Sequence, residues 1–143
     1  MRVGQLLEDK GANVVKIRTG SSLREAAQLL VRHGIGALIV TDGGGRMAGI
    51  LSERDVARFF SQNETGTDAP VDAVMTADVI SCSPDHSVAE LAAIMSTSNI
   101  RHLPVVEGTN VVGMVSIRDV VRFRLGELEE ENTTLRGLIA ALE

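Results

Sequence analysis

Residues 49–59 read GILSERDVARF, and residues 113–123 repeat this pattern 64 positions later as GMVSIRDVVRF. Seven of the eleven positions are identical, and they include a glycine, a serine, two arginines and an aspartate as well as apolar residues. Packing alone does not require identical polar residues. The repeat therefore indicates two copies of one small binding unit.

The repeat extends over nearly the whole chain. Six further positions recur at an offset of 65, with Ser22, Glu25, Ala27, Ile35, Leu38 and Val40 matched by Ser87, Glu90, Ala92, Ile100, Leu103 and Val105. Residues 3–7 resemble residues 71–75 at an offset of 68. We divide the chain into a first repeat (1–65), a second repeat (66–123) and a C-terminal tail (124–143). Because 143 residues make one ordinary domain, we expect one shared core with ligand sites in the cleft between the repeats.

Each repeat is predicted to form a β-α-β-β-α unit. The first has strands at 14–17, 36–41 and 47–51 and helices at 23–32 and from 53, and the second has strands at 79–82, 102–106 and 111–115 and helices at 88–97 and from 117. The last two strands of each unit flank a short polar turn and are predicted to form a hairpin. The fold class is α+β (mixed α/β), with two pseudo-symmetric repeats packed together and a C-terminal helix.

Composition excludes several classes of partner. The net charge is −5, aromatic residues are 2% of the chain and Trp and Tyr are absent, so the basic patch and stacking surface of nucleic-acid binding are missing. No apolar stretch approaches 18 residues and the N-terminus has no apolar leader, so we expect no membrane partner and a cytoplasmic location.

Metal and catalytic sites are not indicated either. Cys82 is the single cysteine, which excludes an intramolecular disulfide, and it is expected to be a buried, inert thiol in a strand. The three histidines have no partner at the i+4 spacing of a metal site, and no Ser-His-Asp or Cys-His arrangement is evident. We predict no metal, no catalytic residue and no enzymatic activity.

Both repeats carry two Ser-x-x-acid boxes at predicted helix starts. Residues 22–25 and 87–90 end in Glu, the usual partner in a capping box, and are assigned to capping. The other two boxes end in the shorter Asp, which closes a capping box less well, and an Arg precedes it; their members are Ser52, Arg54 and Asp55 in the first repeat and Ser116, Arg118 and Asp119 in the second.

The Ser-x-Arg-Asp boxes have the chemistry of a nucleotide site. A carboxylate in the first helical turn could hold a ribose diol, while the helix N-terminus and the Arg attract phosphate. Gly49 and Gly113, three residues before each Ser, would let a ligand approach the strand backbone closely. Plain helix capping remains the alternative.

The motifs, in this order and in two copies, resemble the paired cystathionine-β-synthase (CBS) domains, also called a Bateman module. The resemblance rests on the Gly-φ-φ-Ser-x-Arg-Asp segments at 49–55 and 113–119 (φ is apolar), NIRHLPVV at 99–106, VDAVM at 71–75 and SPD at 83–85. It covers residues 2–123.

The resemblance implies a regulatory module that binds adenosine-containing ligands between the repeats. AMP is the favoured ligand, ADP, ATP, NAD(H) and S-adenosylmethionine are alternatives, and no other cofactor is required. Asp55 and Asp119 would hold ribose hydroxyls, with Ser52 and Ser116 beside the ribose-phosphate. Adenine would lie against Val15, Ile35 and Met114 in the Asp119 site and against Ile50, Ile80 and Ile100 in the Asp55 site.

The two sites are expected to differ in their preference for phosphate. The second repeat has Arg101 and His102 where the first has Gly36 and Ala37. Arg101 could meet a phosphate in the Asp119 site, and His102 could assist, or could be a strand residue packed under the hairpin. We expect the Asp119 site to bind phosphorylated ligands more tightly.

The tail is predicted to be an amphipathic helix. Its leucines, mostly three, four or seven residues apart, are Leu125, Leu128, Leu135, Leu138 and Leu142. Such a stripe docks on its own domain or pairs with a second chain. We favour a homodimer, because the resemblance to CBS modules implies a disc-shaped dimer. An unidentified effector protein is a further partner. The alternative function is a ligand-free dimeric protein-interaction scaffold.

Overall fold

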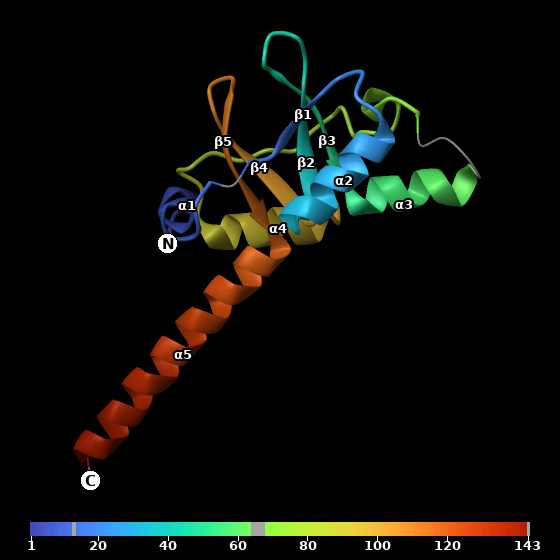
Figure 1. The fold of residues 1–143 in the computed structure, drawn as a ribbon. Helices are drawn as coiled ribbons and strands as arrows, with labels where there is room; N and C mark the ends of the chain where they lie inside the picture. The colour runs from blue at the N-terminus through green and yellow to red at the C-terminus, as the bar shows by residue number, and fades with distance from the viewer. Residues whose placement is uncertain (13, 64–67, 143) are drawn as a thin grey trace.

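The computed structural model describes residues 1–12, 14–63 and 68–142 and has a mixed helix and strand architecture (Figure 1). In chain order, the elements are α1 (Val3–Lys10), β1 (Lys16–Arg18), α2 (Leu23–His33), β2 (Ala37–Thr41), β3 (Met47–Ser52), α3 (Glu53–Gln62), the 3-10 helix η1 (Val71–Ala73), α4 (Val88–Ser98), β4 (His102–Glu107), β5 (Asn110–Ser116) and α5 (Ile117–Leu142). The predicted mixed fold with a C-terminal helix is confirmed. Among the described residues, no helix is long and apolar enough to cross a membrane.

The two repeats form unequal sheets. In the first, β1 pairs in parallel with β2, and β2 pairs antiparallel with β3. In the second, β4 and β5 form an antiparallel pair, and the strand predicted at 79–82 is reduced to a single parallel bridge between Cys82 and Val105. The prediction of a third strand there was therefore wrong.

Proline explains the missing strand. In the first repeat the backbone N–H of Ile39 donates to the carbonyl of Val15 at 3.0 Å. The position that matches Ile39 in the second repeat is Pro104, which has no N–H to donate to the corresponding carbonyl of Ile80. The ladder therefore stops at Cys82, whose N–H still reaches the Pro104 carbonyl at 2.9 Å.

The opening segments of the two repeats are exchanged between the two cores. Val3 and Leu6 of α1 are buried among residues of the second repeat, such as Leu91 and Leu103. Val71 of η1 is buried in the core of the first repeat. The repeats are therefore linked by apolar burial in both directions, beyond any contact between their sheets.

The exchange accounts for the two repeated glycines. A Cβ atom at Gly49 would lie 2.6 Å from Met75 Sδ and 2.7 Å from the carbonyl oxygen of Thr76, which is bridged to the next residue of β3. A Cβ at Gly113 would lie 2.6 Å from Leu7 Cδ2, and Leu7 is the residue that corresponds to Met75. The expectation that these glycines admit a ligand was wrong, because the exchanged segments take that space.

Helix α5 joins the last helix of the second repeat to the tail without a break and projects away from the two sheets (Figure 1). Val120 is buried and Phe123 packs against the second core. From residue 124 to 142 all side chains except the half-buried Glu127 are exposed, so the tail does not dock on its own domain.

Candidate ligand-binding site

The four serine boxes all cap helices. Ser22 Oγ accepts the backbone N–H of Glu25 at 3.1 Å, and Ser87 and Glu90 form a complete capping box in which Glu90 Oε1 accepts the Ser87 N–H at 3.1 Å. That hydrogen bond from the Ser87 backbone lowers the pKa of Glu90. The predicted capping role of these two boxes fits the structure.

The two aspartates also close complete capping boxes. Asp55 Oδ2 accepts the Ser52 N–H at 2.9 Å and the Ser52 hydroxyl at 3.0 Å, and Asp119 Oδ2 accepts the same two groups of Ser116 at 2.8 and 3.0 Å. The expectation that Asp closes the box less well was wrong. Both caps use Oδ2, which leaves Oδ1 directed elsewhere: Asp55 Oδ1 lies 3.6 Å from an Arg58 nitrogen.

Lys10 makes the Asp119 box chemically different from the Asp55 box. Its Nζ donates to Asp119 Oδ2 at 2.9 Å, and the two side chains are only 22% and 14% exposed. Burial raises the pKa of Asp119, but hydrogen bonds from the Ser116 backbone, Lys10 and the Ser116 hydroxyl, together with the Lys10 charge, outweigh burial and hold that pKa below its usual value. Asp119 is therefore ionised at neutral pH, and α1 of one repeat is tied to the Ser116–Asp119 capping box of the other.

Two cavities lie beside the two aspartates. The Asp55 cavity has a volume of about 240 Å³ and the Asp119 cavity about 420 Å³, against roughly 300–1,000 Å³ for typical small-molecule sites. All fifteen predicted site residues line one or both of them. Ile50, Ser52, Arg54, Asp55, Ile80 and Ile100 line the first, Val15, Ile35, Met114, Ser116, Arg118 and Asp119 the second, and Gly36, Arg101 and His102 both.

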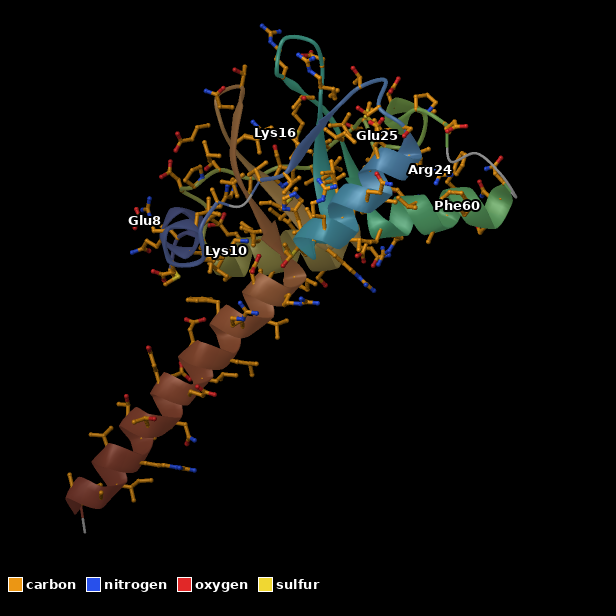
Figure 2. All side chains as sticks on the ribbon, in the orientation of Figure 1. Glu8, Lys10, Lys16, Arg24, Glu25 and Phe60 are labelled. Atoms are coloured by element: carbon orange, nitrogen blue, oxygen red, sulfur yellow. The ribbon has the colours of Figure 1, made fainter. Side chains whose placement is uncertain are left out.

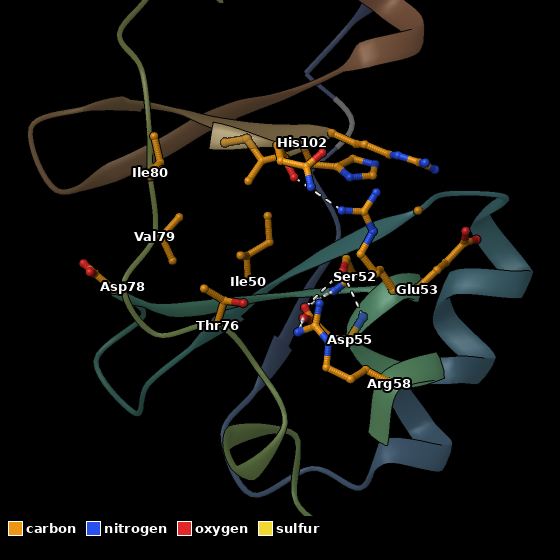
Figure 3. A pocket seen from close by; sticks show the side chains of 15 residues that line it. Ile50, Ser52, Glu53, Asp55, Arg58, Thr76, Asp78, Val79, Ile80 and His102 are labelled. Atoms are coloured by element: carbon orange, nitrogen blue, oxygen red, sulfur yellow. Dashed lines mark hydrogen bonds and ion pairs between the residues drawn. The ribbon is translucent and has the colours of Figure 1, made fainter. Parts of the chain in front are cut away.

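Each cavity combines residues from both repeats, as Figure 3 shows for the Asp55 cavity. Ser52 and Asp55 lie at the start of α3 in the first repeat, and Ile50 lies on β3 just before them. Val79 and Ile80 approach from the second repeat and add an apolar wall. This geometry places a capped carboxylate, two helical-turn arginines and an apolar surface around one small space.

Gly36 and His102 form part of the wall between the two cavities. A Cβ at Gly36 would lie 2.9 Å from the His102 ring, so the imidazole packs directly on that glycine. Burial lowers the pKa of His102, with the nearby Glu53 carboxylate opposing that effect. At neutral pH, His102 therefore contributes a neutral ring that can donate or accept a hydrogen bond.

The sequence assigned Arg101 and His102 to the Asp119 site, but the structure places both residues on both cavities. The difference in charge between the cavities comes from other residues. Four cationic side chains and two carboxylates line the Asp119 cavity, namely Lys10, Arg101, Arg118, Arg122, Glu53 and Asp119. Three of each line the Asp55 cavity, namely Arg54, Arg58, Arg101, Glu53, Asp55 and Asp78. The Asp119 cavity is thus the more cationic.

Several lining residues were missed from the sequence. Arg58 and Arg122 follow the two aspartates by three residues, so they lie on the same helix face, and their identity in both repeats was a usable signal. Lys10 gave no such signal, because it reaches Asp119 only through the exchange of α1 between the cores. Among the described residues, no group of three or more His, Cys, Asp or Glu side chains could hold a metal ion.

Comparison with known proteins identifies the family. The sequence matches the family described as "CBS domain" over residues 5–62 and again over residues 71–126. The chain belongs to the CBS-domain family and contains a pair of these domains, as the repeated motifs predicted.

Relatives and solved structures agree with this assignment. A 33.4 kDa protein of Thermofilum pendens, named for its place in a ribosomal RNA operon, is 39% identical over 126 residues, which are 85% of this chain but only 41% of that protein. The CBS domain pair of protein MJ0100, solved with 5′-methylthioadenosine and S-adenosyl-L-methionine, has a TM-score of 0.80 at 30% identity over 89% of this chain and 98% of that one. A CBS domain protein of Pyrobaculum aerophilum complexed with AMP has a TM-score of 0.76 at 30% identity over 83% and 89%.

Proposed function

We propose that this CBS pair is a non-enzymatic regulatory module that binds an adenosine-containing ligand between its two repeats. The observation that carries the proposal is the placement of Asp55 and Asp119, each in the first turn of a helix and each beside a cavity with an apolar wall supplied partly by the other repeat. Oδ2 of each aspartate is used by its cap, so Oδ1 is the atom offered to a ribose hydroxyl.

The ligand class is supported by the neighbours. The Pyrobaculum aerophilum protein was solved with AMP, and the MJ0100 pair with 5′-methylthioadenosine and S-adenosyl-L-methionine. These compounds share adenosine, which needs an apolar surface for the base and hydrogen-bond acceptors for the sugar. Both features are present in each cavity. AMP is our first candidate, and ATP, ADP and NAD(H) belong to the same proposal.

The two cavities are lined by different charges and therefore favour different members of this ligand class. The Asp119 cavity, with its excess of cationic groups including Lys10 and Arg122, favours a phosphate-bearing ligand. The Asp55 cavity balances its positive and negative side chains and includes Asp78, so it suits an uncharged or cationic compound such as methylthioadenosine or S-adenosylmethionine. A ligand in either cavity contacts both repeats and stabilises one relative arrangement of them.

The regulated target is proposed to be a second protein, and the module itself is proposed to act as a homodimer. The exposed apolar residues of α5 supply a surface for pairing that the two cavities do not use. A scaffold that binds no ligand is the competing function, and in that case the aspartates serve only as caps.

A thermal-shift series tests the proposal. AMP, ATP, NAD, S-adenosylmethionine and methylthioadenosine are added in separate experiments, with wild type, Asp119→Ala and the matched variant Glu90→Ala, which opens a capping box that lies outside both cavities. A ligand at 100 times its Kd adds about 2.7 kcal/mol to the folded state. We expect the AMP shift to be retained in Glu90→Ala and lost in Asp119→Ala. If no adenosine compound shifts the wild type, the scaffold function is favoured instead.

A further inference from the structure

Helix α5 carries an apolar face, interrupted by Asn132, that no other described part of the chain covers; Figure 2 shows the helix projecting from the body with its side chains free. The residues of this face, each at least half exposed, are Val121, Leu125, Leu128, Leu135, Ile139 and Leu142. A helix of 26 residues is about 39 Å long, and its last part projects free of the body. A helix in a protein gains most of its stability from packing its apolar face against other elements, and an isolated helix is only marginally stable. The uncovered face of α5 therefore indicates a partner.

The spacing of these residues is that of a coiled-coil seam. Written as a heptad a to g, the a positions are Leu125, Asn132 and Ile139, and the d positions are Val121, Leu128, Leu135 and Leu142. Val120 and Phe123, which pack α5 against its own domain, fall at c and f on the opposite side of the helix. The helix can therefore keep its domain contact and present the seam to a partner from Val121 to Leu142.

We propose that α5 pairs with α5 of a second copy of this chain as a parallel, in-register, two-stranded coiled coil. Leucine at three of the four d positions favours two strands. Asn132 is the one polar residue in the seam, and a single asparagine at an a position specifies register and oligomeric state because the two amides can bond only to each other. Its place near the middle of the seam fixes the alignment of both ends.

The charges beside the seam match the same arrangement. In a parallel pair, the residue at g faces the residue five positions later, at e, in the other helix. Arg124 then faces Glu129 of the partner subunit, and Glu131 faces Arg136 of the partner subunit. Both pairs are attractive and each occurs twice by symmetry. Arg124 bonds Glu127 of its own helix at 3.0 Å in this structure, an exposed pair that a partner carboxylate can share.

The antiparallel arrangement that aligns Leu125 with Leu135 of the partner subunit fits less well. There each a position faces a d position, so the Asn132 amide would be buried against leucine without a hydrogen-bond partner. The two Glu131 side chains would also approach each other at g, which is repulsive. Both observations favour the parallel arrangement.

The parallel dimer has a consequence for the ligand sites. Asp119 lies in the first turn of α5, so the helix that forms the seam begins at the Asp119 cavity. Two CBS pairs would be held at the same end of the coiled coil, with their Asp119 cavities near the point where the helices diverge.

Sedimentation velocity on the full chain tests the seam. Leu128→Glu places a charge at a d position and should raise the dimer Kd by about 100-fold or more. Thr134→Glu places the same charge at c, away from the seam, and should leave the dimer unchanged. A wild type that is monomeric at tens of micromolar, or two variants that dimerise equally, would overturn the proposal.

Cross-linking tests the orientation. Leu142→Cys should form a disulfide between two copies only if the helices are parallel and in register. Wild type is the control, because its single Cys82 is buried and burial raises the pKa of that thiol to about 11, so it should not cross-link. If Leu142→Cys forms no such disulfide and Val121→Cys instead links to Ile139→Cys in a mixture of those two variants, the helices are antiparallel and the proposal is wrong.

A charge exchange tests the flanking pairs. Glu131→Arg alone should weaken the dimer because it faces Arg136 of the partner subunit. The double variant Glu131→Arg with Arg136→Glu should restore it. Failure of the second change to restore the dimer would contradict the parallel pairing.

Discussion

The ion pair between Lys10 and Asp119 allows a prediction of stability at defined pH. Asp119→Asn keeps the shape of the side chain and an acceptor for the Ser116 N–H, but it removes the charge 2.9 Å from Lys10 Nζ. Hydrogen bonds to charged groups contribute about 1.5–3 kcal/mol. We use the lower end because part of the lysine remains exposed to water, and expect a loss of about 1.5 kcal/mol at pH 7, equivalent to about 5 °C in Tm for a chain of this length.

The pH dependence follows from the lowered pKa of Asp119 in the folded protein. A carboxyl group with a depressed folded pKa stabilises the protein above its unfolded value of about 3.9, and this contribution is lost as the pH falls through the lower folded value. The difference between wild type and Asp119→Asn should therefore be constant from about pH 7 to pH 8, where the nearby His102, whose pKa is lowered by burial, stays neutral in both proteins. It should disappear at a pH below the folded pKa.

Urea unfolding followed by circular dichroism at 222 nm is the assay, because the chain has no Trp or Tyr for fluorescence. Asp55→Asn is the matched control, since Asp55 closes the same kind of box with no lysine bonded to it among the described residues. We expect Asp119→Asn to lose more stability than Asp55→Asn at pH 7. Equal losses, or a loss that persists undiminished in acid, would refute the assignment of this energy to the Lys10 pair.

Three further predictions concern close packing and the buried thiol. Gly49→Ala should destabilise by about 1–3 kcal/mol in urea unfolding, because the new methyl would lie 2.7 Å from the rigid Thr76 carbonyl; a change under 0.5 kcal/mol would contradict this contact. Gly36→Ala should displace the His102 ring and weaken ligand binding in both cavities at least tenfold, measured by calorimetry. Unchanged affinity would show that the contact between Gly36 and His102 is not part of either binding site. Cys82 should react with a thiol reagent at pH 8 far more slowly in the native protein than in urea, because its pKa is about 11 when folded; equal rates would show that it is accessible.

Much of the fold was predictable because the same sequence pattern occurs twice in the chain. The repeated Ser-x-Arg-Asp boxes defined both helix starts, and Asp55 and Asp119 were found where the pattern placed them. The residues predicted for each cavity came from the family resemblance, and the structure brings them together. Their role in ligand binding stays a prediction.

The remaining features depend on contacts between segments far apart in the chain. The pairing of Lys10 with Asp119 spans 109 positions and follows from the exchange of α1, which no local pattern encodes. The purpose of Gly49 was misread for the same reason. The missing strand before α4 was different, because Pro104 was visible in the sequence and its lack of an N–H predicts a broken ladder.

Isothermal titration of AMP into the wild-type protein tests most directly whether this CBS pair binds an adenosine ligand at its capped aspartates. The titration is repeated with Asp119→Ala and with Glu90→Ala. The account predicts saturable binding that Glu90→Ala preserves and Asp119→Ala weakens at least tenfold. The account would be contradicted if the heat of injection did not exceed the heat of dilution at AMP concentrations up to the millimolar range, or if Asp119→Ala bound AMP with the same affinity as wild type.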